Sequence, residues 1–313
     1  MRCQIYANGR SGWLSSIGRQ RRVPASDKRR FTAKSDPSHD RSAASLTAEA
    51  MEASHDAACF FSTPINMQAT TLPNPPVSTP SLMLLGFEPL RATLEFVGMR
   101  AMDRKALPRG DGHAVVIFPG LASDHVALAP LKTLCNDLGY AAFDWGRGLN
   151  AGPQGDIDNW LDALADDVSV MTRSHGKPIS LLGWSLGGIY AREVAKRLPN
   201  RARQVITIGT PFAGSPEHTH ARWVYRLVNG NKPPFSEALA RRLGTPPGVP
   251  TTSIFSRSDG IVAWQACVQA GSERQCENIE VKGSHCGLGW NKQVFQVVAD
   301  RLCQPHGQWK PMG

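Results

Sequence analysis

Residues 179–188 read Ile179-Ser180-Leu181-Leu182-Gly183-Trp184-Ser185-Leu186-Gly187-Gly188. The first four residues form a mostly apolar run typical of a buried strand, and a helical pattern begins directly at Leu186. The junction fits G-x-S-x-G, in which a serine occupies a sharp strand-to-helix turn. Glycines two residues before and after Ser185 remove the Cβ atoms that would collide on such a turn. The stretch therefore predicts a strained turn that presents the Ser185 hydroxyl.

Strand-like runs alternate with helical segments on both sides of this turn. This alternation is typical of an α/β protein with a mainly parallel sheet covered by helices on both faces. Strands are expected at Ala114–Phe118, Tyr140–Phe143, Ile179–Leu182, Val205–Ile208, Thr252–Phe255 and Asn278–Val281, and helices at Val126–Leu138, Ile157–Arg173, Leu186–Arg197 and Asn291–Leu302.

Two further segments have patterns of their own. A helix is expected over residues 87–102, with Leu90, Leu94, Val97 and Ala101 on one face packed against the core. The stretch between the fourth and fifth strands, about 212–249, is long and rich in proline and aromatic residues. It is predicted to be a short insertion into the sheet domain.

The positive charge is concentrated at the beginning of the chain. Residues 1–45 hold ten Lys or Arg and three Asp or Glu, a net +7 out of +9 for all 313 residues. Residues 1–80 lack a sustained period and contain a proline-rich run, so we expect a disordered basic leader and linker followed by one domain over 81–313. Translation could also start at Met51, Met67 or Met83.

The N-terminal residues and the cysteines indicate the cellular location and whether the chain has a zinc site. No secretory signal peptide and no membrane-spanning run is evident, so a cytoplasmic location is expected. The seven cysteines form no C-x-x-C pair, which predicts no zinc site. One disulfide among Cys267, Cys276 and Cys286 remains possible.

A base for Ser185 is expected in a loop after a later strand. In the G-x-S-x-G arrangement the partners follow in the order serine, acid, histidine. His285 lies in Gly283-Ser284-His285-Cys286-Gly287, between the last strand and the last helix. Asp259 is the carboxylate of the turn after the preceding strand, and it would orient the imidazole. Residues that fit these roles less well are His218, His220, His306, Glu273 and Glu277.

Serine chemistry on a carbonyl also needs backbone N–H groups that face the developing oxyanion. One is expected from Leu186, directly after the serine. The other is expected from Leu121, in the loop Phe118-Pro119-Gly120-Leu121-Ala122 after the first core strand. A plain Pro-Gly turn without a donor is the alternative for this loop.

Three segments beside the serine turn resemble a known family. Residues 116–121, 253–262 and 282–288 resemble the oxyanion, acid and histidine segments of α/β-hydrolase lipases and esterases, especially compact bacterial ones. The resemblance runs from about Val115 to Leu302 and does not include the first 80 residues. One departure is Pro119, where such lipases often have histidine.

These features together predict a serine hydrolase that cleaves carboxylic esters through an acyl-serine, without a metal or other cofactor, acting on a small-molecule or lipid ester. The aromatic residues of the insertion, Trp223, Tyr225 and Phe235, are candidates for the acyl pocket. The alternatives are an acyltransferase with the same machinery and a non-catalytic binding protein on this scaffold. A third, nucleic-acid binding by the basic leader, is not expected.

Overall fold

The computed structural model describes residues 78–213, 237–270 and 275–312. Its centre is a six-stranded sheet in the order β2-β1-β3-β4-β5-β6, in which every neighbouring pair is parallel. The bounds are β1 Ala114–Phe118, β2 Ala141–Asp144, β3 Ile179–Trp184, β4 Ala202–Ile208, β5 Thr251–Phe255 and β6 Cys276–Glu280. The predicted fold class is confirmed, with strand ends shifted by a few residues.

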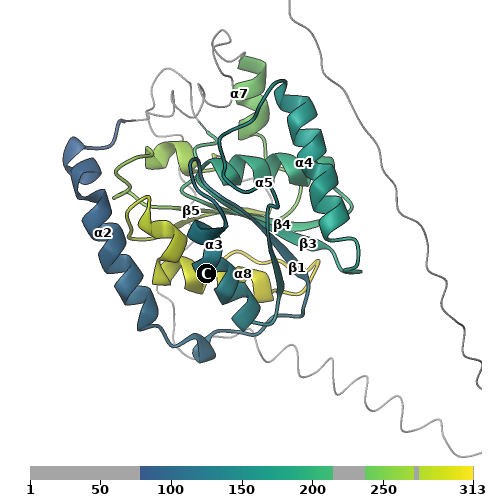
Figure 1. Cartoon of the computed structure of the whole chain (residues 1–313), viewed down its shortest axis with the longest axis horizontal. Helices are drawn as coiled ribbons and strands as arrows, with labels where there is room; N and C mark the ends of the chain where they lie inside the picture. Colours follow the sequence, from purple (N-terminus) through teal and green to yellow (C-terminus); the bar gives the residue numbers. More distant parts are fainter. Residues whose placement is uncertain (1–77, 214–236, 271–274, 313) are drawn as a thin grey trace, which may run out of the picture. The chain divides into compact units, whose positions relative to one another are not determined.

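Helices cover both faces of the sheet (Figure 1). On one face α3 (His125–Asp137) and α8 (Lys292–Cys303) pack into a hydrophobic core with residues such as Leu131 and Phe295. On the other, α4 (Ile157–Met171) and α5 (Leu186–Arg197) enclose a second core that includes Leu164 and Tyr190. The four inner strands β1, β3, β4 and β5 are fully buried between these layers, because side chains from both of their faces contact helices.

Helix α2 (Leu82–Arg100) differs from its expected orientation. The predicted core face is wrong: Leu90, Leu94 and Val97 are 56%, 63% and 61% exposed, and Ala101 is exposed as well. The buried positions include Glu88 and Ala92. The apolar periodicity predicted that the stripe with Leu90 and Leu94 would be buried. The buried stripe instead holds charged side chains, because these form hydrogen bonds with other parts of the protein.

The segment between β4 and β5 is described in part. Phe212 is buried, and α7 (Glu237–Gly244) returns the chain to the sheet beside α5. Residues 214–236 lie outside the described residues, as do residues 1–77 and with them nearly all of the predicted leader. The boundaries expected for leader and insertion therefore stay predictions.

Two further expectations concern membrane crossing and thiols. Among the described residues, no helix combines the length and the apolar character needed to span a bilayer. Within the same ranges, no disulfide joins Cys267, Cys276 and Cys286 to one another. The possible disulfide left open by the sequence is therefore absent from the structure.

Candidate active site

Ser185 lies on the turn between β3 and α5, and its backbone is in a rare conformation. Its φ and ψ are 53° and −124°, a positive φ that side-chain-bearing residues seldom adopt. The glycines around it are required for space: a Cβ at Gly183 would lie 2.4 Å from the Gly187 oxygen, and one at Gly188 would lie 2.0 Å from Thr210 Oγ1. The expected strained turn is therefore present, and its glycines allow α5 to start directly against the sheet.

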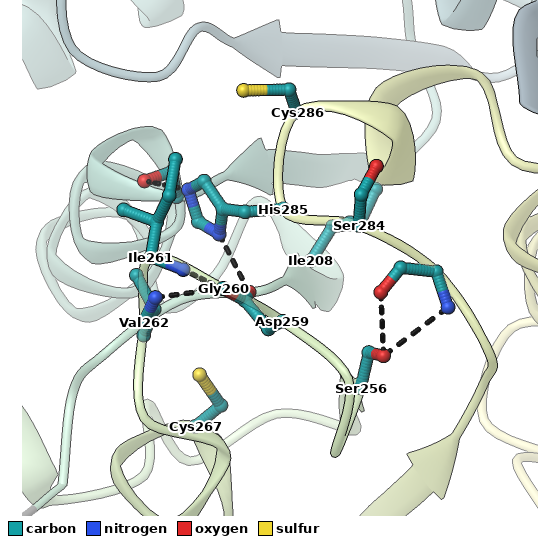
Figure 2. Close-up of polar contacts among 12 residues, drawn as sticks. Ile208, Ser256, Asp259, Gly260, Ile261, Val262, Cys267, Ser284, His285 and Cys286 are labelled. Carbon is teal, nitrogen blue, oxygen red and sulfur yellow. Dashed lines mark hydrogen bonds and ion pairs between the residues drawn. The ribbon is translucent and has the colours of Figure 1, made fainter. Parts of the chain in front are cut away.

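The structure brings the three predicted side chains into one hydrogen-bonded line. His285 Nε2 lies 3.0 Å from Ser185 Oγ, and His285 Nδ1 lies 2.7 Å from Asp259 Oδ2. Asp259 Oδ1 accepts the backbone N–H groups of Ile261 at 2.8 Å and Val262 at 2.6 Å (Figure 2). Because those bonds fix the carboxylate, its second oxygen stays directed at the imidazole.

The backbone of His285 is held on both sides. Its N–H donates to Glu88 Oε1 at 3.0 Å, and its carbonyl accepts the indole N–H of Trp184 at 3.2 Å. The loop before it is tied to the acid turn, because Ser256 Oγ donates to the Gly283 carbonyl at 2.7 Å. The ring orientation therefore rests on contacts from three separate elements.

The predicted oxyanion donors lie on two adjoining segments. A Cβ at Gly120 would be 3.3 Å from Ser185 Cβ, so the loop after β1 lies against the serine turn. Within the described ranges, the N–H groups of Leu121 and Leu186 donate to no backbone acceptor. The role of both as oxyanion donors stays a prediction.

Asn150 fixes the position of the loop after β1 through hydrogen bonds, a role that was not predicted from the sequence. Its Nδ2 donates to the Pro119 carbonyl at 2.8 Å, and its backbone carbonyl accepts the Ala122 N–H at 2.8 Å. Its Oδ1 accepts the hydroxyl of Tyr190 at 3.2 Å. Asn150 is fully buried, so these bonds are not exchanged with water.

Comparison with known families agrees with this geometry. A protein-family model described as serine aminopeptidase, S33 (Hydrolase_4) matches residues 111–259, from just before β1 through the serine turn to Asp259. Over these residues the chain is similar to that family, and its sheet and helices have the arrangement of the α/β-hydrolase fold. The matched span ends before His285 and begins after α2, so both of those features lie outside it.

Curated relatives match this chain over a shorter stretch. It is 28% identical over 102 residues to a pimeloyl-[acyl-carrier protein] methyl ester esterase of Shewanella woodyi, covering 32% of this chain and 37% of the relative. It is 33% identical over 107 residues to the serine hydrolase BPHL of Mus musculus, with 32% and 37% covered. The alignments thus span little more than a third of these relatives. Among solved structures, Aspergillus fumigatus lipase B has a TM-score of 0.47 at 16% identity, with 64% of this chain and 54% of that one covered.

The electrostatics of the site act on the imidazole. Burial disfavours protonated His285, but the charge and hydrogen bond of Asp259, together with the charge of Glu88, outweigh it and raise its pKa above the ordinary 6.5. A raised pKa makes the ring a stronger base once it is neutral. The ring therefore takes up a proton from a nearby hydroxyl more readily than a free histidine would.

The other residues considered in the sequence analysis lie away from the Asp259–His285–Ser185 hydrogen-bond line or outside the described residues. Trp223, Tyr225 and Phe235, proposed for the acyl pocket, lie outside, as do His218, His220 and Glu273. His306 is exposed near the C-terminus. Glu277 is buried on β6 and pairs with Arg301 at 2.9 Å. No group of three or more His, Cys, Asp or Glu side chains that could hold a metal occurs in the described part of the chain.

Proposed function

We propose that this α/β hydrolase cleaves carboxylic esters through an acyl-serine intermediate, with Ser185 as nucleophile, His285 as base and Asp259 as the group that orients the imidazole. The observation that carries the proposal is the continuous Asp259–His285–Ser185 hydrogen-bond line, which ends at a serine on a strained turn. The names of the relatives, one a methyl ester esterase and one a serine hydrolase, support the same chemistry.

The first half of the reaction forms the acyl-serine. His285 Nε2 takes the hydroxyl proton as Ser185 Oγ bonds to the ester carbonyl carbon. The carbonyl electrons move to oxygen, and the N–H groups of Leu121 and Leu186 stabilise that negative charge. When the carbonyl re-forms, the bond to the alkoxy group breaks and the leaving alcohol takes the proton from His285.

The second half releases the acid. A water molecule gives a proton to His285 as its oxygen bonds to the acyl carbon, and the same donors hold the oxyanion again. Collapse returns the proton to Ser185 Oγ and frees the carboxylic acid. Asp259 stabilises the imidazolium in both halves and itself stays ionised.

The test is a series of p-nitrophenyl esters, from acetyl to palmitoyl, together with a fluorophosphonate probe that labels activated serines. We expect turnover by the wild-type chain, labelling at Ser185 identified by peptide mass, and loss of both in Ser185→Ala. Ser180→Ala is the matched control: Ser180 lies on the same strand and contacts a histidine at 2.7 Å. It should keep activity and labelling, provided that it folds.

Two results would overturn the proposal. Ester turnover that persists in Ser185→Ala would place the nucleophile elsewhere. A folded wild-type chain that neither turns over any ester nor reacts with the probe would instead favour a binding protein on this scaffold. Product analysis with added alcohol separates hydrolysis from acyl transfer, since transfer yields a new ester rather than the free acid.

A further inference from the structure

Helix α2 directs its charged side chains at the two loops that carry the acid and the base. Glu88, Arg91 and Glu95 follow one another at helical spacing and point inward, while most of the large apolar side chains of α2, such as Leu90 and Leu94, face outward. This arrangement is the reverse of an ordinary amphipathic helix. It needs an explanation, because a carboxylate loses its hydration when it is buried and must find hydrogen-bond donors in the protein.

Glu88 is 3% exposed, and three backbone N–H groups of these loops donate to its carboxylate. Its Oε1 accepts from Gly260 at 2.8 Å and from His285 at 3.0 Å. Its Oε2 accepts from Cys286 at 3.1 Å. Gly260 directly follows Asp259, so one carboxylate bridges the residue after the acid and the backbone of the base.

The neighbours of Glu88 on the helix tie down the same two loops. Arg91 donates to the carbonyl of Ser258 at 2.7 Å and to its hydroxyl at 2.9 Å. Glu95 accepts the N–H of Ser284 at 2.7 Å. The residues on either side of Asp259, and those on either side of His285, are therefore bonded to α2.

The loops are also shaped to fit this helix. A Cβ at Gly260 would lie 2.6 Å from the backbone carbon of Leu84, and one at Gly287 would lie 2.0 Å from Glu95 Oε2. The methyl group at Gly260 would push its loop away from the α2 backbone, and the one at Gly287 would displace the Glu95 carboxylate. The close approach is therefore built into both partners, and it does not depend on the hydrogen bonds alone.

We propose that Glu88 is a positioning residue for the acid–histidine pair: its carboxylate fixes the separation of the Asp259 turn and the His285 loop, and so holds the imidazole between Asp259 and Ser185. Arg91 and Glu95 support it at the flanking residues. The inference rests on the proposed function, but it assigns a role to a helix outside the span that the family model matches.

The charge of Glu88 provides a readout that simple scaffolding would not change. The titratable groups that surround His285 are Asp259 on the acid turn, Glu88 on α2 with Arg91 3.9 Å from it, and the thiol of Cys286 in the histidine loop. The carboxylates of Asp259 and Glu88 both raise the pKa of His285. Removal of the Glu88 charge should therefore lower that pKa, while Asp259 stays in place.

The test compares Glu88→Gln and Glu88→Ala with Glu277→Gln. Glu277 is a matched control, since it is a buried carboxylate that accepts from Met312 N–H at 2.8 Å and Thr252 Oγ1 at 2.7 Å, at the opposite ends of the strands. Measurements are kcat and KM for p-nitrophenyl butyrate from pH 5 to 9, the melting temperature, and the His285 titration by NMR, assigned with His285→Ala.

In Glu88→Ala we expect kcat to fall about 10- to 100-fold with KM changed little, because positioning acts on the chemical step. In the near-isosteric Glu88→Gln, the His285 titration and the acid limb of kcat/KM should both move to lower pH. Glu277→Gln should lower the melting temperature and leave kcat and the titration unchanged. If Glu88→Ala does not fold, the His285 titration and the pH profile of Glu88→Gln still test the inference.

The inference is overturned if folded Glu88→Gln keeps the wild-type kcat and an unshifted His285 titration. It is also overturned if Glu277→Gln lowers kcat as much as Glu88→Ala does. The NMR titration does not depend on ester turnover, so it tests the role of Glu88 even if the wild-type chain hydrolyses no ester. Failure of the proposed function is thereby distinguished from failure of this inference.

Discussion

The substitution Gly187→Ala tests whether the oxyanion donors depend on close contact between α5 and the loop after β1. A Cβ at this position would lie 2.3 Å from the Phe118 carbonyl oxygen and 2.6 Å from the Pro119 carbonyl oxygen, where ordinary contact begins at 3.4 Å. The opposing atoms are backbone, so the two segments must separate by roughly 1 Å in all, a strain that costs about 1–3 kcal/mol of stability.

The same two segments carry the N–H groups of Leu186 and Leu121. A misplacement of about 1 Å in a catalytic arrangement costs on the order of 100-fold in rate. We therefore expect Gly187→Ala to lower kcat about 100-fold, and to lower the melting temperature, with a smaller change in KM. The assay is p-nitrophenyl butyrate turnover, normalised to the folded fraction measured by circular dichroism.

Gly98→Ala is the matched control for a glycine-to-alanine change in a helix. A Cβ at Gly98 meets nothing within 4 Å, so kcat should stay at the wild-type value. A folded Gly187→Ala variant that keeps kcat within about threefold of wild type would contradict this expectation, since the segments would then separate without moving the donors. An equal loss in Gly98→Ala would also refute it.

Three further predictions concern the triad, the pH profile and the leader. Ser185→Ala and His285→Ala should each abolish most ester turnover, and the double variant should be little worse, because the residues act as a unit; steady-state rates that fall multiplicatively would contradict this. Since the base must be neutral and the pKa of His285 is raised, kcat/KM should rise with pH through a midpoint above 6.5, and a profile flat from about pH 5 to 9 would remove His285 as base. A chain that begins at Ser78 should keep full activity in the same assay. A chain that begins at Met83 should have a lower melting temperature, because it lacks the Ser81 hydroxyl that accepts the Met83 N–H at 3.2 Å. Equal melting temperatures of the two chains would show that this helix cap contributes nothing to stability.

The sheet and its helices could be predicted because buried strands and amphipathic helices leave local patterns. Ala114–Phe118 is an unbroken apolar run and matches β1, and Leu186–Arg197 matches α5. The face of α2 could not be predicted in the same way. Its buried stripe holds Glu88, which is stabilised by partners about 170 to 200 residues away in sequence, and no local pattern encodes them.

The candidate site shows the same division between local and distant information. Ser185, Asp259 and His285 each follow a strand, and parallel strands place their carboxyl ends at one edge of a sheet, so their convergence could be predicted. Asn150 and Glu88 carry no such signal, because each acts through backbone groups of loops that only the fold brings near. Buried polar residues beside Gly-rich loops are the nearest hint that the sequence offers.

A second hydrogen-bonded line of a serine, a histidine and an acid occurs at the opposite ends of the strands. It indicates that these three side chains alone do not make a serine reactive. His113 Nε2 lies 2.7 Å from Ser180 Oγ, and its Nδ1 contacts Asp111. Burial lowers the pKa of His113, with the nearby Arg203 charge acting in the same direction and Asp111 opposing them. The lowered pKa disfavours the protonated form of this imidazole, which is already bonded to a serine hydroxyl, as a base would be.

Ser180 lacks the free backbone N–H groups that a helix N-terminus provides next to Ser185. Ser180 lies within β3 and pairs with Val115 on one side and Gln204 on the other, so the surrounding peptide groups are used by two neighbouring strands. Ser185 instead directly precedes α5, whose N-terminal N–H groups and dipole favour negative charge. A fluorophosphonate should accordingly label Ser185 and leave Ser180 unmodified, and labelling of Ser180 would show that a hydrogen-bonded histidine suffices without an oxyanion site.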